Sequence, residues 1–213
     1  MSKVIIGMSM SLDGIASGTT EANFWDVHNA VLGWLFDLQT WRSAAAMDGG
    51  EDNADSRLWA EENERIGAQV LGRRMFDFGN ESWGEEPPFR APVFVLTHRP
   101  QERIGKQGGT SYTFVTDGIA AAVEAAKAAA GGKDVLLAGG LSIAQQALAA
   151  GVVDELAVHV RSVLIGHGAR LFDAIGAEHI HLERTHISGS TGVTHLRYSV
   201  IPTHGTANPG ESS

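Results

Sequence analysis

Cysteine is absent from the 213 residues of the sequence. This absence excludes disulfide bonds, a thiolate nucleophile and metal sites built from cysteine. It is also typical of a protein that works in a reducing compartment.

Basic residues are scarce: 16 Lys and Arg stand against 25 Asp and Glu, which gives a formal net charge of −9, and no basic cluster interrupts this balance. Because nucleic acids and anionic membranes repel an acidic surface, we expect neither as a partner. A ligand that carries phosphate would need a local group of backbone N–H donors and a few arginines.

The N-terminal region lacks a long hydrophobic run. Its apolar stretch KVIIGMSM, residues 3–10, is interrupted by Gly7 and Ser9. It is too short for a membrane span and has no secretory-signal layout, so we expect a cytoplasmic protein.

The residues that are present indicate a folded chain, with 43% hydrophobic and 19% charged residues. This length and composition predict one globular domain over residues 1–201. Residues 202–213, PTHGTANPGESS, contain no large apolar side chain and are predicted to be a disordered tail.

Apolar patterning predicts an alternation of strands and helices. Strands are expected at residues 3–10, 68–72, 92–100, 112–115, 134–140 and 154–165. Helices are expected at 27–41, 73–79, 116–132 and 141–151, with an exposed loop at 46–56. Polar and apolar residues alternate in 179–188 and 192–201 around a short turn, which indicates an antiparallel hairpin. The succession predicts an α/β protein with a mostly parallel sheet whose last strands are antiparallel.

Two adjacent glycines, Gly139 and Gly140, fall where a central strand is followed by a helix. Without a Cβ the backbone can approach a ligand, and the N–H groups of Leu141 and Ser142 at the helix start can bind a phosphate. A tight strand-to-helix turn with no ligand explains the same two glycines, and the pair alone does not decide between these interpretations.

Two further strand ends carry cations. Gly72 ends one strand and is followed by Arg73 and Arg74, while Thr97, His98 and Arg99 end the next. A hydroxyl beside cations suits the 2′-phosphate of a ribose, although a single arginine is often only a solvated surface charge. In parallel sheets, ligands bind at the carboxyl ends of the strands. The sequence therefore predicts a dinucleotide site at this edge.

The chain resembles a known family through the order of its segments MSLDGIA, VLGRRMFD, PVFVLTHRP, LLAGGLSIAQQAL and VDELAVHVRSVLIGHGARLF. Together, over residues 3 to about 200, they are similar to the dihydrofolate reductase-like superfamily, in the branch of the reductase domain of bacterial riboflavin biosynthesis. The resemblance implies an eight-stranded sheet flanked by helices with a C-terminal antiparallel hairpin. It also implies NADPH across the carboxyl ends of the strands, and a homodimer.

The resemblance also assigns residues to roles. The expected cofactor-binding residues are Gly14, Ile15, Gly72, Arg73, Arg74, Thr97, His98, Arg99, Gly139, Gly140, Leu141 and Ser142. Asp13 is the candidate catalytic residue, as a substrate-orienting or proton-handling group. A plain Asp-Gly turn is the alternative for Asp13.

Substrate contacts are expected from Ser11 and Trp34, and from Gly166 and Arg170 in GHGARLF. No acidic residue of the first helix stands in the motif that binds the pterin of dihydrofolate reductases, so we do not expect folate as the substrate. His179 and His181 share one face of a strand, but without a third ligand we expect no metal site.

The sequence as a whole predicts an NADPH-dependent reductase that transfers hydride to a C=N or C=O bond of a small heterocyclic or sugar-derived substrate. The alternative is a dimeric protein of the same fold that binds a nucleotide or another ligand without turnover.

Overall fold

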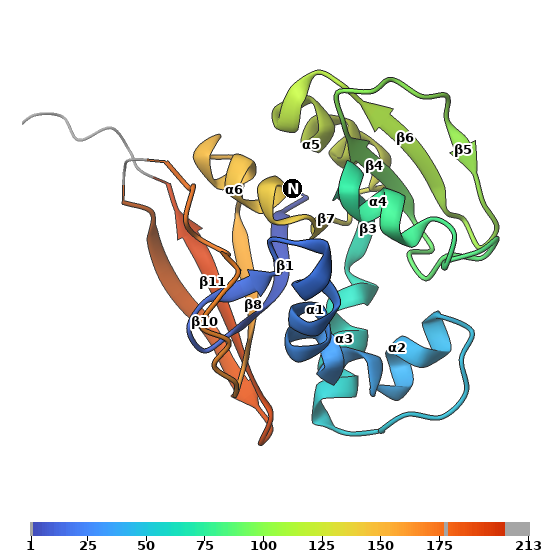
Figure 1. Ribbon diagram of the computed structural model, residues 1–213. Helices are drawn as coiled ribbons and strands as arrows, with labels where there is room; N and C mark the ends of the chain where they lie inside the picture. Colours follow the sequence, from blue (N-terminus) through green and yellow to red (C-terminus); the bar gives the residue numbers. More distant parts are fainter. Residues whose placement is uncertain (1, 177–178, 203–213) are drawn as a thin grey trace, which may run out of the picture.

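The computed structural model describes residues 2–176 and 179–202, and its centre is a sheet in the order β10-β11-β8-β1-β7-β3-β4-β6-β5 (Figure 1). The strands are β1 (Val4–Ser11), β3 (Ile66–Gly72), β4 (Pro92–Leu96), β5 (Ile104–Gly105), β6 (Ser111–Val115), β7 (Asp134–Gly139), β8 (Glu155–Arg161), β10 (His181–Gly189) and β11 (Val193–Ile201). A second, two-stranded sheet pairs β2 (Ile15–Ser17) with β9 (Ala169–Arg170).

The predicted fold class is confirmed. Strands β8, β1, β7, β3, β4 and β6 run parallel to one another, and the hairpin β10-β11 joins β8 in antiparallel register. The sheet has nine strands where eight were expected, because the two-residue strand β5 pairs with β6 at the outer edge.

Helices cover both faces of the sheet. Helices α5 (Gly118–Ala129) and α6 (Leu141–Ala149) pack on the face that holds the main hydrophobic core, with Ile6, Val70 and Leu137 among its fully buried residues. On the opposite face, α1 (Glu21–Phe36) contacts β1 and β8, while α4 (Arg73–Gly79) contacts β3 and β4. Helix α2 (Gln39–Ala44) contacts both α1 and α3 (Ala54–Glu64).

The first helix differs from the expected 27–41. It begins at Glu21 because the side chains of Thr20 and Asn23 form a capping box, which apolar spacing does not reveal. It ends at Phe36, and Leu38 has extended backbone before α2 begins, so Trp41 belongs to a separate helix.

Helix α3 was not predicted, and the expected exposed loop 46–56 overlaps its first residues. Its buried side chains are Asp55 and Ser56, so the buried face carries no apolar repeat. Asn53 caps the helix by accepting a hydrogen bond from the N–H of Ser56. The hydroxyl of Ser56 also lies 2.9 Å from that of Thr40, which joins α3 to α2.

The remaining differences are small. Strand β8 ends at Arg161 instead of Ile165, and the strands β2 and β9 lie in segments expected to be loops. The predicted tail, from residue 203 on, lies outside the described residues.

A matched pair of glycine substitutions tests the packing of β3. A Cβ on Gly67 would collide with the carbonyl oxygen of Ala130 and lie 2.8 Å from Cβ of Lys133, whereas one on Gly33 in α1 meets nothing within 4 Å. We expect Gly67→Ala to lower the free energy of unfolding by about 1–3 kcal/mol. Gly33→Ala should raise it by about 0.5–1 kcal/mol, because alanine favours the helix interior. Urea denaturation measures both, and equal effects of the two changes would contradict the packing.

Candidate active site

A cavity of about 1340 Å³ opens between the sheet and the helices α1, α3 and α4. Its floor includes Gly7 of β1, Leu136 of β7 and Gln69 of β3, and the start of α6 closes one side. Typical ligand pockets measure about 300–1,000 Å³, so this cavity has room for two ligands side by side.

The predicted convergence of the strand ends is confirmed. Gly72, Gly139 and Gly140 all line the cavity, and a Cβ on Gly140 would lie 3.4 Å from Cα of Gly72. Gly140 also has a φ of +90°, which disfavours a residue with a side chain. The backbone conformation at Gly140, rather than a lack of space, is therefore what favours glycine where the two strand ends meet.

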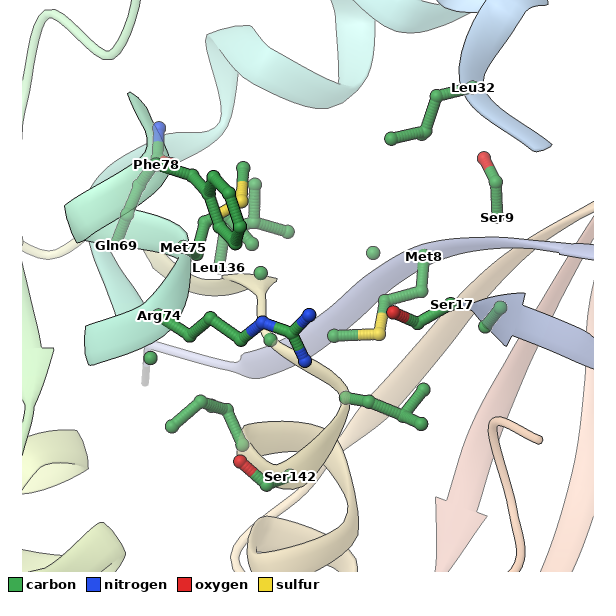
Figure 2. Close-up of a pocket in the computed structure, with 18 of the residues that line it drawn as sticks. Met8, Ser9, Ser17, Leu32, Gln69, Arg74, Met75, Phe78, Leu136 and Ser142 are labelled. Carbon is green, nitrogen blue, oxygen red and sulfur yellow. The ribbon is translucent and has the colours of Figure 1, made fainter. Parts of the chain in front are cut away.

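The arginines after Gly72 face different ways. Figure 2 shows Arg74 extending from α4 into the middle of the cavity, between Ser142 of α6 and Met8 of β1. Its guanidinium lies over the rings of Phe24 and Phe78, at 5.1 and 5.6 Å from their centroids. Arg74 is therefore placed to contact a ligand in the cavity.

Arg73 and Arg99 are joined by one carboxylate. Nε of Arg73 donates to Asp77 Oδ1 at 2.7 Å, and Nη2 of Arg99 donates to Asp77 Oδ2 at 2.9 Å. All three residues line the cavity, as do Thr97 and His98. A phosphate at this position would compete with Asp77 for two guanidinium groups that are already oriented by it.

The loop with the candidate catalytic residue lies outside the cavity lining. The Asp13 carboxylate accepts hydrogen bonds from the Ser11 hydroxyl at 2.6 Å and from the N–H groups of Ile165 and Gly166 at 3.2 and 2.7 Å. These bonds, that of Ser11 first, lower the pKa of Asp13 from 3.8 to about 2. A carboxylate that stays ionised in this way ties two loops together, and the geometry does not support it as the proton-handling residue.

The residues around Asp13 also serve to hold the two loops together. Arg170 donates to the carbonyl oxygen of Asp13, and the carbonyl oxygen of Gly14 accepts from Leu171 at 3.1 Å. Ile15 is buried and its N–H donates to the hydroxyl of Ser11. Ser11, Gly14, Ile15, Gly166 and Arg170 are thus brought together, but they are absent from the cavity lining, to which β2 and β9 contribute Ala16, Ser17 and Ala169 instead.

Trp34 lines the cavity as predicted, and it contacts polar side chains that were not predicted as part of the site. Its indole Nε1 donates to the hydroxyl of Ser9 at 3.1 Å. Its ring lies against the imidazoles of His159 and His195, with centroids 4.9 and 5.0 Å apart. His159 and His195 are buried in the wall formed by β8 and β11.

The two histidines belong to a chain of contacts that we call the histidine chain: Asp55, His195, His159 and Glu62. Asp55 Oδ1 lies 3.2 Å from His195 Nε2, the two Nδ1 atoms lie 2.8 Å apart, and His159 Nε2 lies 3.8 Å from Glu62 Oε2. Of these four residues, His159 and Glu62 line the cavity.

A network of ion pairs continues toward the amino ends of the strands. Arg197 binds Glu62 at 2.8 Å and lies 3.4 Å from Glu155, and Arg65 binds Glu155 and Asp134 at 2.8 and 2.7 Å. Glu155, Arg65 and Arg197 line the cavity. This end of the cavity is therefore charged but internally paired.

A sequence signal for these residues does exist. Glu155 and His159 lie on one face of β8 because side chains alternate along a strand. His195 and Arg197 share one face of β11, and His195 pairs directly with His159 in the register of the two strands. Period-two alternation of polar residues in ELAVHVR and VTHLRYS therefore indicates a polar wall, but the acids on α3 carry no comparable signal.

The cavity fits a dinucleotide such as NADPH at the strand ends. The glycine contact leaves the backbone open, the first N–H groups of α6 have no partner one helical turn earlier, and Arg74 extends into the space. The residues that would hold its phosphates are Arg73, Arg74, Thr97, Arg99, Gly140, Leu141 and Ser142, all of which line the cavity.

Comparison with known families decides where the chain belongs. The family described as RibD C-terminal domain matches residues 2–196. The chain belongs to this family. Membership supports an oxidoreductase of the type of the riboflavin-pathway reductases, on the dihydrofolate reductase-like fold, so the predicted resemblance is confirmed.

Solved structures of RibD C-terminal domain relatives share the fold. A riboflavin biosynthesis protein from Shewanella sp. PV-4 matches with a TM-score of 0.65 and 20% identity, over 95% of this chain and 100% of that one. A pyrimidine reductase-like protein from Corynebacterium diphtheriae matches with a TM-score of 0.56 and 16% identity, over 94% and 92%.

A longer relative comes from Thermotoga maritima, a diaminohydroxyphosphoribosylaminopyrimidine deaminase/5-amino-6-(5-phosphoribosylamino)uracil reductase. It matches with a TM-score of 0.58 and 11% identity, over 94% of this chain and 57% of that one. No curated protein sequence matches the chain.

Two other features of the RibD C-terminal domain can be stated for the described residues only. Within 2–176 and 179–202, no three metal-binding side chains, including His179 and His181, come together as a metal site. In the same part of the chain, no helix has both the length and the apolar character needed to cross a bilayer.

The buried histidine predicts a pH dependence of stability. Burial, with the nearby His195 and Arg197, lowers the pKa of His159 from 6.5 to about 3. Because the unfolded chain takes up a proton below pH 6.5 and the folded one does not, this stabilisation is present above pH 6.5 and is lost as the pH falls toward 3. Between pH 7.5 and 5 we expect the free energy of unfolding to fall by about 2 kcal/mol from this group.

Urea denaturation at the two pH values measures this loss. His159→Gln should remove it, whereas the exposed His181→Gln should retain it. A loss of the same size in His159→Gln as in the unchanged protein would show that His159 is not the cause.

Proposed function

We propose that this protein is an NADPH-dependent reductase that transfers hydride to a C=N or C=O bond of a small heterocyclic or sugar-derived substrate. The observation that carries the proposal is the meeting of Gly72 and Gly140 beside Arg74 in one cavity with room for two ligands. Family membership and the fold of the relatives support a reductase of this type.

The charges of the cavity support an orientation for the two ligands. At the strand ends, Arg73, Arg74 and Arg99 outnumber the single acid Asp77, which favours the phosphates of the cofactor. Bound there, NADPH supplies a hydride from its nicotinamide ring. The chain itself binds the phosphates, excludes water and orients the substrate beside that ring.

The aromatic side of the cavity suits a planar heterocycle. Phe24 and Phe78 stack at 4.7 Å with an interplanar angle of 8°, and His28 stacks on Phe24 at 5.5 Å. Trp34 also lines the cavity and is more buried than Phe78. These rings offer faces against which a flat substrate ring can pack.

Nucleotide titration tests the cofactor. We expect NADPH to bind with micromolar affinity, followed by nicotinamide fluorescence, and Arg99→Ala to weaken NADPH at least about tenfold while changing NADH less than about twofold. The reason is that Arg99 lies beside Thr97 at the position assigned to the 2′-phosphate. Arg74→Ala should weaken both nucleotides.

The control for this titration is Arg103→Ala, which removes the same charge from an exposed residue outside the cavity lining and should change neither affinity. Absence of binding of both nucleotides to the unchanged protein would overturn the proposal. The acceptors tested should include 5-amino-6-(5-phosphoribosylamino)uracil and its dephosphorylated form. If NADPH binds tightly but none of the acceptors supports its oxidation, the result would favour the alternative, a protein that binds a nucleotide without turnover.

The edge strand β10 supports the expected homodimer. Leu182, Ile187 and Ile201 of the hairpin are 41%, 54% and 45% exposed, next to an unpaired strand edge. We expect a dimer in light scattering after gel filtration and a monomer for Ile187→Asp. Met47→Asp, the same kind of change at a 44% exposed residue after α2, should remain dimeric.

A further inference from the structure

The histidine chain has a defined proton order. A carboxylate only accepts hydrogen bonds, so Nε2 of His195, 3.2 Å from Asp55, carries a proton. When His195 is neutral, its Nδ1 is bare and must accept from Nδ1 of His159, 2.8 Å away. Nε2 of a neutral His159 is then bare.

This bare nitrogen is directed toward the cavity. The other ring nitrogen of His159, Nδ1, faces His195, which does not line the cavity. Nε2 of His159 lies 3.8 Å from Oε2 of Glu62, and both His159 and Glu62 line the cavity. Two acceptors therefore face each other with no hydrogen between them. The separation of 3.8 Å is too long for a hydrogen bond, so Nε2 of His159 keeps a lone pair that can take a proton.

Uptake of one proton rearranges the chain. A proton that binds Nε2 of His159 allows the hydrogen on its Nδ1 to pass to Nδ1 of His195. His159 is neutral again, and the positive charge resides on His195, beside the carboxylate of Asp55. This placement is favourable because the buried charge acquires a counter-ion at 3.2 Å.

We propose that Asp55, His195 and His159 form a proton relay whose cavity end, Nε2 of His159, supplies the proton that accompanies hydride transfer. The proposal rests on the proposed function and identifies its proton donor. His159 would be the catalytic residue, because it lines the cavity in which a substrate would bind, while His195 and Asp55 are positioning residues that act through it.

The step balances. With a hydride that a bound nicotinamide cofactor would supply, the carbon of the C=N or C=O group would form its new C–H bond, and the electron pair of the double bond would move to nitrogen or oxygen. That atom takes the proton from Nε2 of His159, whose N–H bond breaks, while the Nδ1 proton of His195 returns to Nδ1 of His159. The histidine chain thereby loses one positive charge, and it regains that charge when it takes up a proton from the solvent.

Every element packed against the two imidazoles contributes to their surroundings. Helix α1 contributes the indole of Trp34, and β1 contributes the hydroxyl of Ser9. The charged groups are Asp55 and Glu62 of α3, Arg197 of β11, and Glu155 and Arg161 of β8. Arg161 is engaged with the carbonyl oxygens of Ala30 and Gly192, and Arg197 with the acids Glu62 and Glu155, so Asp55 is the carboxylate that faces His195.

The relay can be observed directly in the protein without cofactor. Long-range ¹H–¹⁵N NMR spectra of protein labelled with ¹⁵N-histidine report which ring nitrogen carries hydrogen, with His159→Gln and His195→Gln used for assignment. At high pH we expect hydrogen on Nδ1 of His159 and on Nε2 of His195. As the pH falls, His195 should become charged while His159 stays neutral and its hydrogen moves to Nε2, both at one midpoint.

This titration of the unchanged protein decides the proposal even where a variant fails to fold. Hydrogen on Nε2 of His159 throughout, a charged His159 beside a neutral His195, or two separate midpoints would each overturn it. Asp55→Asn should lower the shared midpoint by about one pH unit or more, because the imidazolium loses its counter-ion. Asp52→Asn, at an exposed residue paired with Arg57, should move it by less than about 0.2 unit.

Kinetics link the relay to catalysis. With an acceptor that supports NADPH oxidation, kcat should fall as the pH rises above the NMR midpoint, and Asp55→Asn should move this fall to lower pH by the same amount without changing NADPH affinity. If kcat does not change with pH around the NMR midpoint, the proposal that His159 supplies the proton in catalysis is overturned. Failure of the cofactor proposal would appear instead as absence of nucleotide binding, which leaves the NMR result unaffected.

Discussion

The structure depends on the contact between the ends of β3 and β7. Gly72 and Gly140 lie backbone against backbone, and the φ of +90° at Gly140 disfavours a residue with a side chain there. This contact brings the starts of α4 and α6 to the same edge of the cavity. The pairing of β3 with β7 shifts register just before this contact, between Val70 and Leu71.

The cavity that results has two chemically different ends. At the strand ends, guanidinium groups outnumber carboxylates and are partly solvated. Toward α3, the acids Asp55, Glu62, Glu155 and Asp134 lie against arginines and imidazoles. Asp55, Glu155 and the two imidazoles are buried, and the other groups are partly exposed. A ligand with phosphates at one end and a neutral ring with hydrogen-bonding groups at the other matches this division, and an additional phosphate beside α3 does not.

The succession of strands along the chain and the phosphate side of the cavity could be predicted from the sequence because both follow from local rules. Continuous apolar runs such as PVFVL mark buried parallel strands, and glycine or arginine at their ends marks the ligand edge. The substrate side could not be predicted in this way. Helix α3 buries Asp55 and Ser56 rather than an apolar stripe, and its value to the site arises only when β8 and β11 bring two histidines opposite it.

The loop of Asp13 shows the reverse case, in which a motif was found and its role was not. Aspartate followed by glycine marks a turn, and the family resemblance placed it in the active site. The structure instead surrounds its carboxylate with donors from a loop about 150 residues later in the chain, which are contacts that no local pattern contains.

Helix α3 also sets a length. Asp55 and Glu62 are seven residues apart, nearly two full turns, so a rise of about 1.5 Å per residue separates them by about 10 Å along one face. Two imidazole rings in series span that interval. Inserting a single residue between the two acids would rotate one of them by about 100° around the helix. That acid would no longer face its imidazole, so proton exchange along the series would be interrupted although both histidines were unchanged.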